Sequence, residues 1–212
     1  INFKGRGILF LVLLATMMLP YQVTTVPNYL IFNALGLIDT LPALFIGSFL
    51  GGGAFYKCSA LSSLKIDDSQ LSVLHESVFG GCSALTAVTL PAGIISIGAN
   101  AFSNCTKLDI ETLPPNLQTI GEKAFSASGL KKVILPDTVM SIEKEAFYNC
   151  TALKTVSIGK GAVTVGKEAF RGCPALDDLT ISESDAVKTL EDGAFDHCTS
   201  LSAVVIPNNV TV

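Results

Sequence analysis

The stretch EAFYNCTALKTVSI, residues 145–158, decides the fold because its pattern recurs along most of the chain. In this stretch an Ala-Phe pair precedes a Cys, and the aliphatic residues that follow end in a V-x-I triplet. Versions of the pattern occur at 53–66, 77–91, 100–114, 123–136, 168–181 and 193–207. The Phe anchors lie 22 to 25 residues apart, at Phe55, Phe79, Phe102, Phe125, Phe147, Phe170 and Phe195. Such regular spacing predicts a solenoid of stacked coils.

The end of each unit predicts a short strand. Val88 and Leu90 lie at positions i and i+2, so their side chains share one strand face, which we expect to point into the coil. A proline directly follows four of these predicted strands, at Pro91, Pro114, Pro136 and Pro207. Because proline has no backbone N–H to donate, it ends the hydrogen-bond ladder between strands. Because one coil cannot bury its own apolar face, stability must come from stacking, with the Phe rings forming a column.

A glycine precedes the Ala-Phe pair by three residues in several units, at Gly98, Gly121 and Gly166. This position predicts a tight corner, where φ is positive or the backbone is crowded. Other units have His75, Glu143 or Glu191 in the same place, so the corner does not strictly require glycine.

Two neighbouring units depart from the pattern. Ser128 replaces the Cys, and the loop that follows it is one residue shorter than in the other units. In the preceding unit, Glu111 occupies a position where an inward aliphatic side chain is expected. We therefore expect local irregularity in these two coils.

The six cysteines all hold one repeat position, at Cys58, Cys82, Cys105, Cys150, Cys173 and Cys198. Cysteine is among the most buried residue types and acts there as a small hydrophobic side chain. The shared position predicts a column of buried free thiols rather than a disulfide framework. A metal site needs ligands that converge, as in C-x2-C loops, and the sequence has none. We predict no metal, no cofactor and no catalytic residue, because every candidate nucleophile belongs to a repeat position.

Residues 54–212 resemble the BspA-like, or Treponema-type, leucine-rich repeat proteins, whose units follow IGxxAFxxCxxLxxVxIP. The resemblance implies an α/β-type repeat solenoid, a right-handed leucine-rich repeat coil with short parallel strands. It also implies a secreted or surface-attached protein that serves adhesion or binding and is not an enzyme. The same residues carry 17 acidic and 12 basic side chains, which is unlike a nucleic-acid-binding protein.

Residues 1–53 differ in character, since Lys4, Arg6 and Asp39 are their only charges. The apolar run Ile8–Leu19 is twelve residues long, too short alone to span a bilayer. The stretch containing MMLPYQV at 17–23 resembles permease subunits of carbohydrate ABC transporters of the maltose type, through residues Lys4, Arg6, Met17, Met18, Pro20, Gln22, Val23, Pro27, Leu35, Gly36, Leu37 and Thr40. The resemblance implies a hydrophobic helical segment of membrane type.

The two patterns meet at Gly53-Ala54-Phe55, and neither supplies what the other lacks. We therefore expect a fragmentary or chimeric chain with two parts, 1–53 and 54–212, the second holding about seven repeats. The alternative function is that of a transporter permease fragment, with membrane association through residues 1–53.

The outward strand positions are the candidate binding surface. They are small and polar, and a basic step is followed by an acidic one. The candidate residues are Lys65, Thr89, Lys131, Lys132, Lys154, Asp177 and Asp178. Such a charge step is also typical of an ordinary solvated face. We predict an unidentified protein or glycan partner for this surface, and a location at the cell surface or outside the cell.

Overall fold

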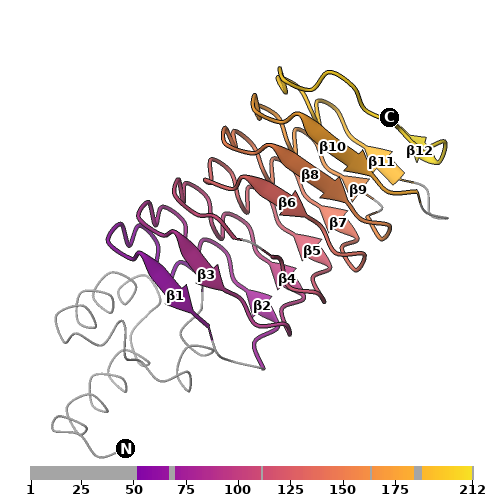
Figure 1. The fold of residues 1–212 in the computed structure, drawn as a ribbon. Coiled ribbons are helices and arrows are strands. Elements are labelled where there is room, and N and C mark those ends of the chain that lie inside the picture. The colour runs from indigo at the N-terminus through magenta and orange to yellow at the C-terminus, as the bar shows by residue number, and fades with distance from the viewer. Residues whose placement is uncertain (1–51, 67–69, 111, 163, 184–187, 212) are drawn as a thin grey trace, which may run out of the picture. The chain divides into compact units, whose positions relative to one another are not determined.

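The computed structural model describes residues 52–66, 70–110, 112–162, 164–183 and 188–211. The chain divides into two compact units, 1–41 and 42–212, and all described residues belong to the second. The helical segment and the permease resemblance predicted for residues 1–53 therefore lie almost entirely outside the described residues. The described part is a solenoid of about six turns built from parallel strands (Figure 1).

One side of the solenoid carries the strands that end five of the repeat units. They are β1 (Ser63–Lys65), β3 (Ala87–Thr89), β6 (Lys132–Ile134), β8 (Thr155–Ile158) and β10 (Asp178–Ile181). The first two pair with each other, and the last three form a sheet in the order β10-β8-β6, all parallel. We call these two groups together the broken sheet, because among the described residues no strand joins β3 to β6. The strand predicted at the end of each unit is confirmed in five units. Leu108–Ile110 and residues 201–207 of the last unit form no strand, and Val204 and Ile206 of that unit are 38% and 46% exposed.

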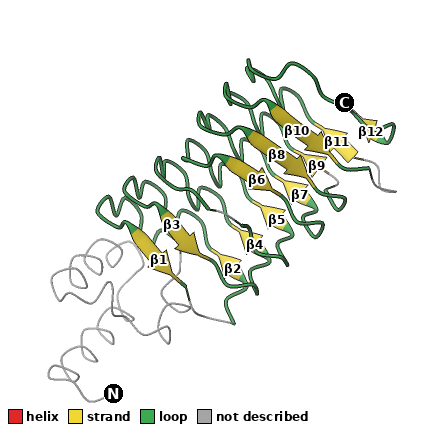
Figure 2. Ribbon diagram, in the orientation of Figure 1, coloured by secondary structure: helices red, strands yellow, loops and turns green. Residues whose placement is uncertain are grey.

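A second strand in each turn builds a longer sheet, which we call the long sheet (Figure 2). Its members are β2 (Val73–Leu74), β4 (Ser96–Ile97), β5 (Thr119–Ile120), β7 (Ser141–Ile142), β9 (Thr164–Val165), β11 (Lys188–Leu190) and β12 (Val210–Thr211). They form one parallel sheet of seven strands. Sequence analysis predicted only one strand per unit, since a strand of two residues is too short to show an alternating pattern.

The described residues contain no helix, so the α/β character expected for the repeat is wrong there. Turns occupy the segment that contains the Phe, and two columns of left-handed residues flank it. Two positions before the Phe, φ is between 53° and 77° in residues such as Asn100 and Glu145, and the same holds two positions after it in residues such as Asn104 and Ala127. Two reversals of this kind, four residues apart, leave no room for a helical turn.

The corner glycines are crowded, as predicted, but they are not left-handed. A Cβ on Gly98 would lie 2.7 Å from the carbonyl oxygen of Leu74 in the preceding coil. A Cβ on Gly121 would lie 2.8 Å from the backbone of Ala99. Close approach of neighbouring coils, and not an unusual φ, is therefore the reason for glycine at these corners.

The Phe column confirms the stacking predicted from the repeat. Neighbouring rings from Phe55 to Phe195 stack with centroids 4.9 to 5.5 Å apart and interplanar angles of 3° to 17°. The five rings between the two ends have no exposed surface. The backbone N–H of Phe125 donates to the carbonyl oxygen of Ala146 in the next coil at 2.8 Å, and the other coils repeat this bond. The column runs from coil to coil and joins the coils into one core.

The gap in the broken sheet falls where the sequence departs from the repeat. Leu108–Ile110 form no strand, although the side chain of Ile110 is buried. In the next coil the shortened loop places Gly129 close to the backbone of the preceding coil. A Cβ added to Gly129 would lie 2.5 Å from the carbonyl oxygen of Thr106. The predicted irregularity of these coils is therefore confirmed, and it interrupts only the sheet that this segment builds.

Candidate binding surface

The strands of the broken sheet have one face in the core and the other in solvent. In β6, Val133 is buried while Lys132 and Ile134 are exposed, and β10 alternates in the same way. This alternation follows from the two-residue period of a strand. The exposed positions are those that the sequence predicted to face outward.

The register of the strands brings most of the candidate residues together. Lys132 and Asp178 both pair with Thr155 of β8, one from each side. A second row runs beside this one, because the backbone N–H of Lys154 donates to the Lys131 carbonyl at 2.8 Å and that of Asp177 to the Lys154 carbonyl at 3.1 Å. Five of the seven candidate residues therefore share one patch of three strands, which we call the charge step.

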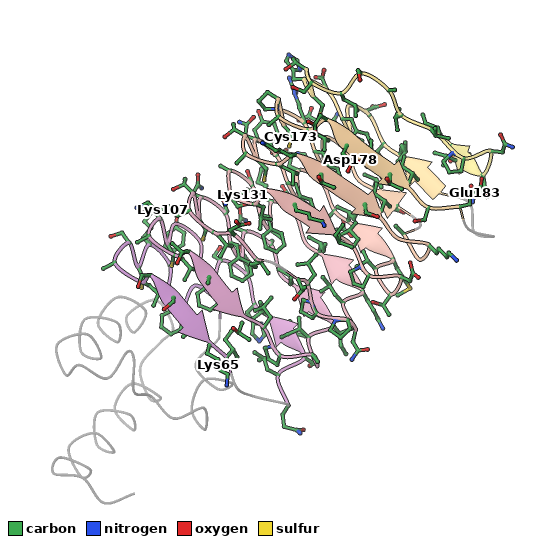
Figure 3. The ribbon with its side chains drawn as sticks, viewed as in Figure 1. Lys65, Lys107, Lys131, Cys173, Asp178 and Glu183 are labelled. Atoms are coloured by element: carbon green, nitrogen blue, oxygen red, sulfur yellow. The ribbon has the colours of Figure 1, made fainter. Side chains whose placement is uncertain are left out.

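The other two candidates lie apart from the charge step. Lys65 and Thr89 pair in register between β1 and β3, on the far side of the gap in the broken sheet. Figure 3 shows Lys65 near β1, well separated from Lys131 and Asp178. The structure thus divides the predicted surface into two places.

Most charges of the charge step have no internal partner. Lys131 Nζ forms an ion pair with Asp109 Oδ2 at 2.7 Å. Within the described part of the chain, no ion pair involves Lys132, Lys154, Asp177 or Asp178. These side chains are exposed, so their charges are available to a ligand that approaches the face.

The outer face of the long sheet is a second surface, which sequence analysis missed. In-register positions form a column of hydroxyl side chains at Ser96, Thr119, Ser141, Thr164, Thr189 and Thr211. Beside this column, Ile95 and Met140 are 39% and 51% exposed. The available signal was the Ser or Thr that precedes the I-G dipeptide in several units, as in Ser96-Ile97-Gly98. This face presents hydroxyl and apolar side chains, whereas the charge step presents charged side chains.

The cysteines confirm the predicted column of buried free thiols. All six are free and buried. The thiol of Cys105 donates to the carbonyl oxygen of Phe79 in the preceding coil at 3.1 Å, and four other cysteines make the equivalent bond. Burial raises the pKa of the Cys105 thiol to about 12. The Cys105 thiol therefore stays protonated at neutral pH and acts as a packing group and weak donor, since nucleophiles and metal ligands need the thiolate.

Ser128 continues the thiol column where the cysteine is missing. Its hydroxyl lies 3.3 Å from the sulfur of Cys150 and is buried. Among the described residues, no group of three or more His, Cys, Asp or Glu side chains is placed to hold a metal ion. Nor does that part of the chain contain a helix of the length and apolar character that a membrane span requires.

Comparison with known proteins supports the repeat and not the permease. The family model described as "BspA type Leucine rich repeat region (6 copies)" matches residues 47–141 and 119–212. The family model does not extend to residues 1–46, and the comparisons do not support the permease resemblance. No curated protein matches the chain significantly.

Several solved structures are similar to this chain, among them two leucine-rich repeat proteins of known organism. A leucine-rich repeat protein from T. pallidum is 30% identical, with a TM-score of 0.65, over 71% of this chain and 70% of that one. Another, from Bacteroides ovatus, is 32% identical, with a TM-score of 0.68, over 76% of this chain. The match spans only 41% of the Bacteroides protein.

Proposed function

Because the chain belongs to the BspA-type leucine-rich repeat family, we propose that it is a non-enzymatic module that binds a protein or glycan at the cell surface. The fold supports this function because a solenoid presents an extended row of side chains on a rigid core. In the described residues the thiols, which are reactive side chains when exposed, are buried and pack in the core. What remains for function is the outer surface.

The observation that carries the proposal is the charge step, in which four of the five charged side chains form no ion pair within the described residues. Lys132 and Lys154 are exposed, and in the part of the chain that the structure describes neither makes an ion pair with Asp177 or Asp178. Charges of this kind steer a charged partner and select its orientation. The rigid register of β6, β8 and β10 holds them in fixed order, so little conformational entropy is lost when a ligand binds.

The test is binding of the full chain to an array of immobilised extracellular-matrix proteins and glycans. We expect at least one ligand whose binding weakens about tenfold in the double variant Lys132→Ser/Asp178→Ser, since rim charges contribute about one kcal/mol or more. The matched control is Lys167→Ser, which removes an exposed charge away from the charge step. The proposal fails if no ligand binds, or if the double variant binds every ligand as well as the control does.

A further inference from the structure

The charge step has a symmetry of its own about β8. Lys132 and Asp178 lie in register on the two sides of Thr155. Lys131 and Asp177 lie on the two sides of Lys154 in the neighbouring row. Both rows are therefore positive on the β6 side and negative on the β10 side.

Consider a twofold axis that runs parallel to β8, just above the exposed face. Rotation about this axis places a second copy face to face with the first, with β6 of one copy over β10 of the other. We propose that a second copy of this chain docks face to face on the charge step through such a twofold axis. Lys132 of each copy then lies opposite Asp178 of the other, and Lys131 lies opposite Asp177. A twofold interface uses the same patch on both copies, so the patch must be complementary to itself, and this one is.

The uncharged residues of the patch fit the same arrangement. Thr155 lies between the two charged columns, where the axis passes, and its side chain is small. Ile134 and Thr180 pair with Ser157 from opposite sides, so the rotation places the exposed Ile134 of one copy over Thr180 of the other. Each copy thereby covers an isoleucine that is 45% exposed in the isolated chain.

Charge order favours a second copy over an unrelated partner. The backbones of Lys132 and Asp178 are about 10 Å apart, because β8 lies between their strands. The sheet therefore does not place the two charged groups in contact within one copy. In the dimer each group meets an opposite charge directly. A second copy supplies both charges in the required order, and it does so twice.

The geometry also limits how strong the association is. The patch spans three strands, far less than the interface of a stable dimer, so we expect a dissociation constant on the order of 10⁻⁴ M. Lys154 lies in the middle row, so the two copies of this residue face each other across the axis. That like-charge contact weakens the dimer, and it provides a diagnostic variant.

This inference deepens the proposed function and rests on it, because the charge step is the binding face in both. The test is sedimentation equilibrium of the full chain over a hundredfold concentration range, at low and at high salt. We expect a monomer–dimer equilibrium that weakens at least tenfold in 0.5 M salt, because exposed charges are screened there.

Charge reversals test the symmetry itself. Lys132→Glu alone and Asp178→Lys alone should each weaken association more than tenfold, because like charges then meet at both contacts. An equimolar mixture of these two variants should form heterodimers, and the double variant Lys132→Glu/Asp178→Lys should associate as the unchanged chain does. Lys167→Glu, away from the face, should have no effect.

Replacing Lys154 by Ser should strengthen the dimer severalfold, an effect that a general loss of positive charge would not produce. The proposal is overturned if the unchanged chain stays monomeric throughout, or if the mixed single variants associate no better than each one alone. Ligand binding on the array is measured separately, so a monomer that still binds a ligand refutes the dimer and leaves the proposed function standing.

Discussion

The long sheet and the broken sheet are built by the same repeat, yet they differ in continuity and in surface. The long sheet runs through seven strands without interruption, whereas the broken sheet divides between β3 and β6. The outer face of the long sheet carries hydroxyl groups, whereas that of β6, β8 and β10 carries lysine and aspartate side chains. Both are built on coils joined by the same Phe column. The difference indicates that the core and the long sheet connect all the coils, whereas the broken sheet connects only some of them.

The position of the sequence departures explains why only one sheet is interrupted. Ser128 and Gly129 lie between the Phe and the last aliphatic residues of their unit, in the segment that leads into the broken sheet. The long sheet uses the segment before the Phe, where Thr119 and Ile120 still pair with Ser141 and Ile142. An irregularity in one segment is thus confined to one side of the coil.

Removing the ring of Phe125 should have the largest effect, because it damages the core that joins the coils. Phe125→Ala should lower the free energy of unfolding by about 3–5 kcal/mol, since the side chain is fully buried between two neighbours. Urea denaturation followed by circular dichroism measures it. Phe195→Ala is the control: this ring is partly exposed, so it should cost less. A loss below 1 kcal/mol at Phe125 would contradict the role of the column.

Adding a methyl group at Gly129 should affect the broken sheet alone. Gly129→Ala should cost about 2 kcal/mol, because its Cβ would press on the backbone of Thr106 and the coil must shift. Ser126→Ala, in the same turn, should cost much less. The same urea titrations measure both, and equal stabilities for the two variants would argue against a tight junction at this gap.

The thiol column predicts a fall in stability at alkaline pH. The folded-state pKa of Cys105 is about 12 against an ordinary value of 9.0, so its contribution is complete below pH 9 and is lost as pH rises from 9 to 12. One such thiol lowers the free energy of unfolding by about 1.4 kcal/mol per pH unit in this window. Cys105→Ser should remove that part of the slope between pH 9 and 10. An unchanged slope would mean that the thiol titrates normally in the folded protein.

A glycine in a left-handed position should give the smallest effect, and a favourable one. Ala127 has φ of 53°, a conformation that strains a residue with a Cβ. Ala127→Gly should raise the free energy of unfolding by about 0.5–1 kcal/mol, after allowing for the greater freedom of glycine in the unfolded chain. Ser126→Gly, outside the left-handed columns, should lower it. The thermal midpoints of the two variants should move in opposite directions, and a parallel shift would contradict the assignment.

Some features were predictable from the sequence because they recur in every unit. The Phe and Cys columns repeat large or buried residue types at one spacing, and stacking is the arrangement that buries them. The outward lysines and aspartates followed from strand alternation. The departures at Ser128 and Glu111 correctly located the irregular coils, although residue 111 itself lies outside the described residues.

Other features depended on contacts between coils, which no single unit reveals. The long sheet has strands too short to recognise, and its ladder exists only between neighbouring turns. The left-handed columns include lysine and glutamate as well as asparagine, so residue type alone did not mark them. The sequence could not show that Lys132 and Asp178 form no ion pair among the described residues, because this depends on where their side chains lie. The boundary between two parts of the chain at residues 53 and 54 stays a prediction. The protein or glycan partner of the outer surface also stays a prediction.

Residue-resolved amide hydrogen exchange of the full chain tests the central claim most directly. If the long sheet and the Phe column hold the coils together, the amides of Ile97, Ile120, Ile142 and Phe125 should exchange slowly and with similar protection, as one cooperative block. The amide of Ile110, in the gap of the broken sheet, should exchange markedly faster than these. Equal protection in the gap and the long sheet, or rapid exchange throughout the long sheet, would contradict the account.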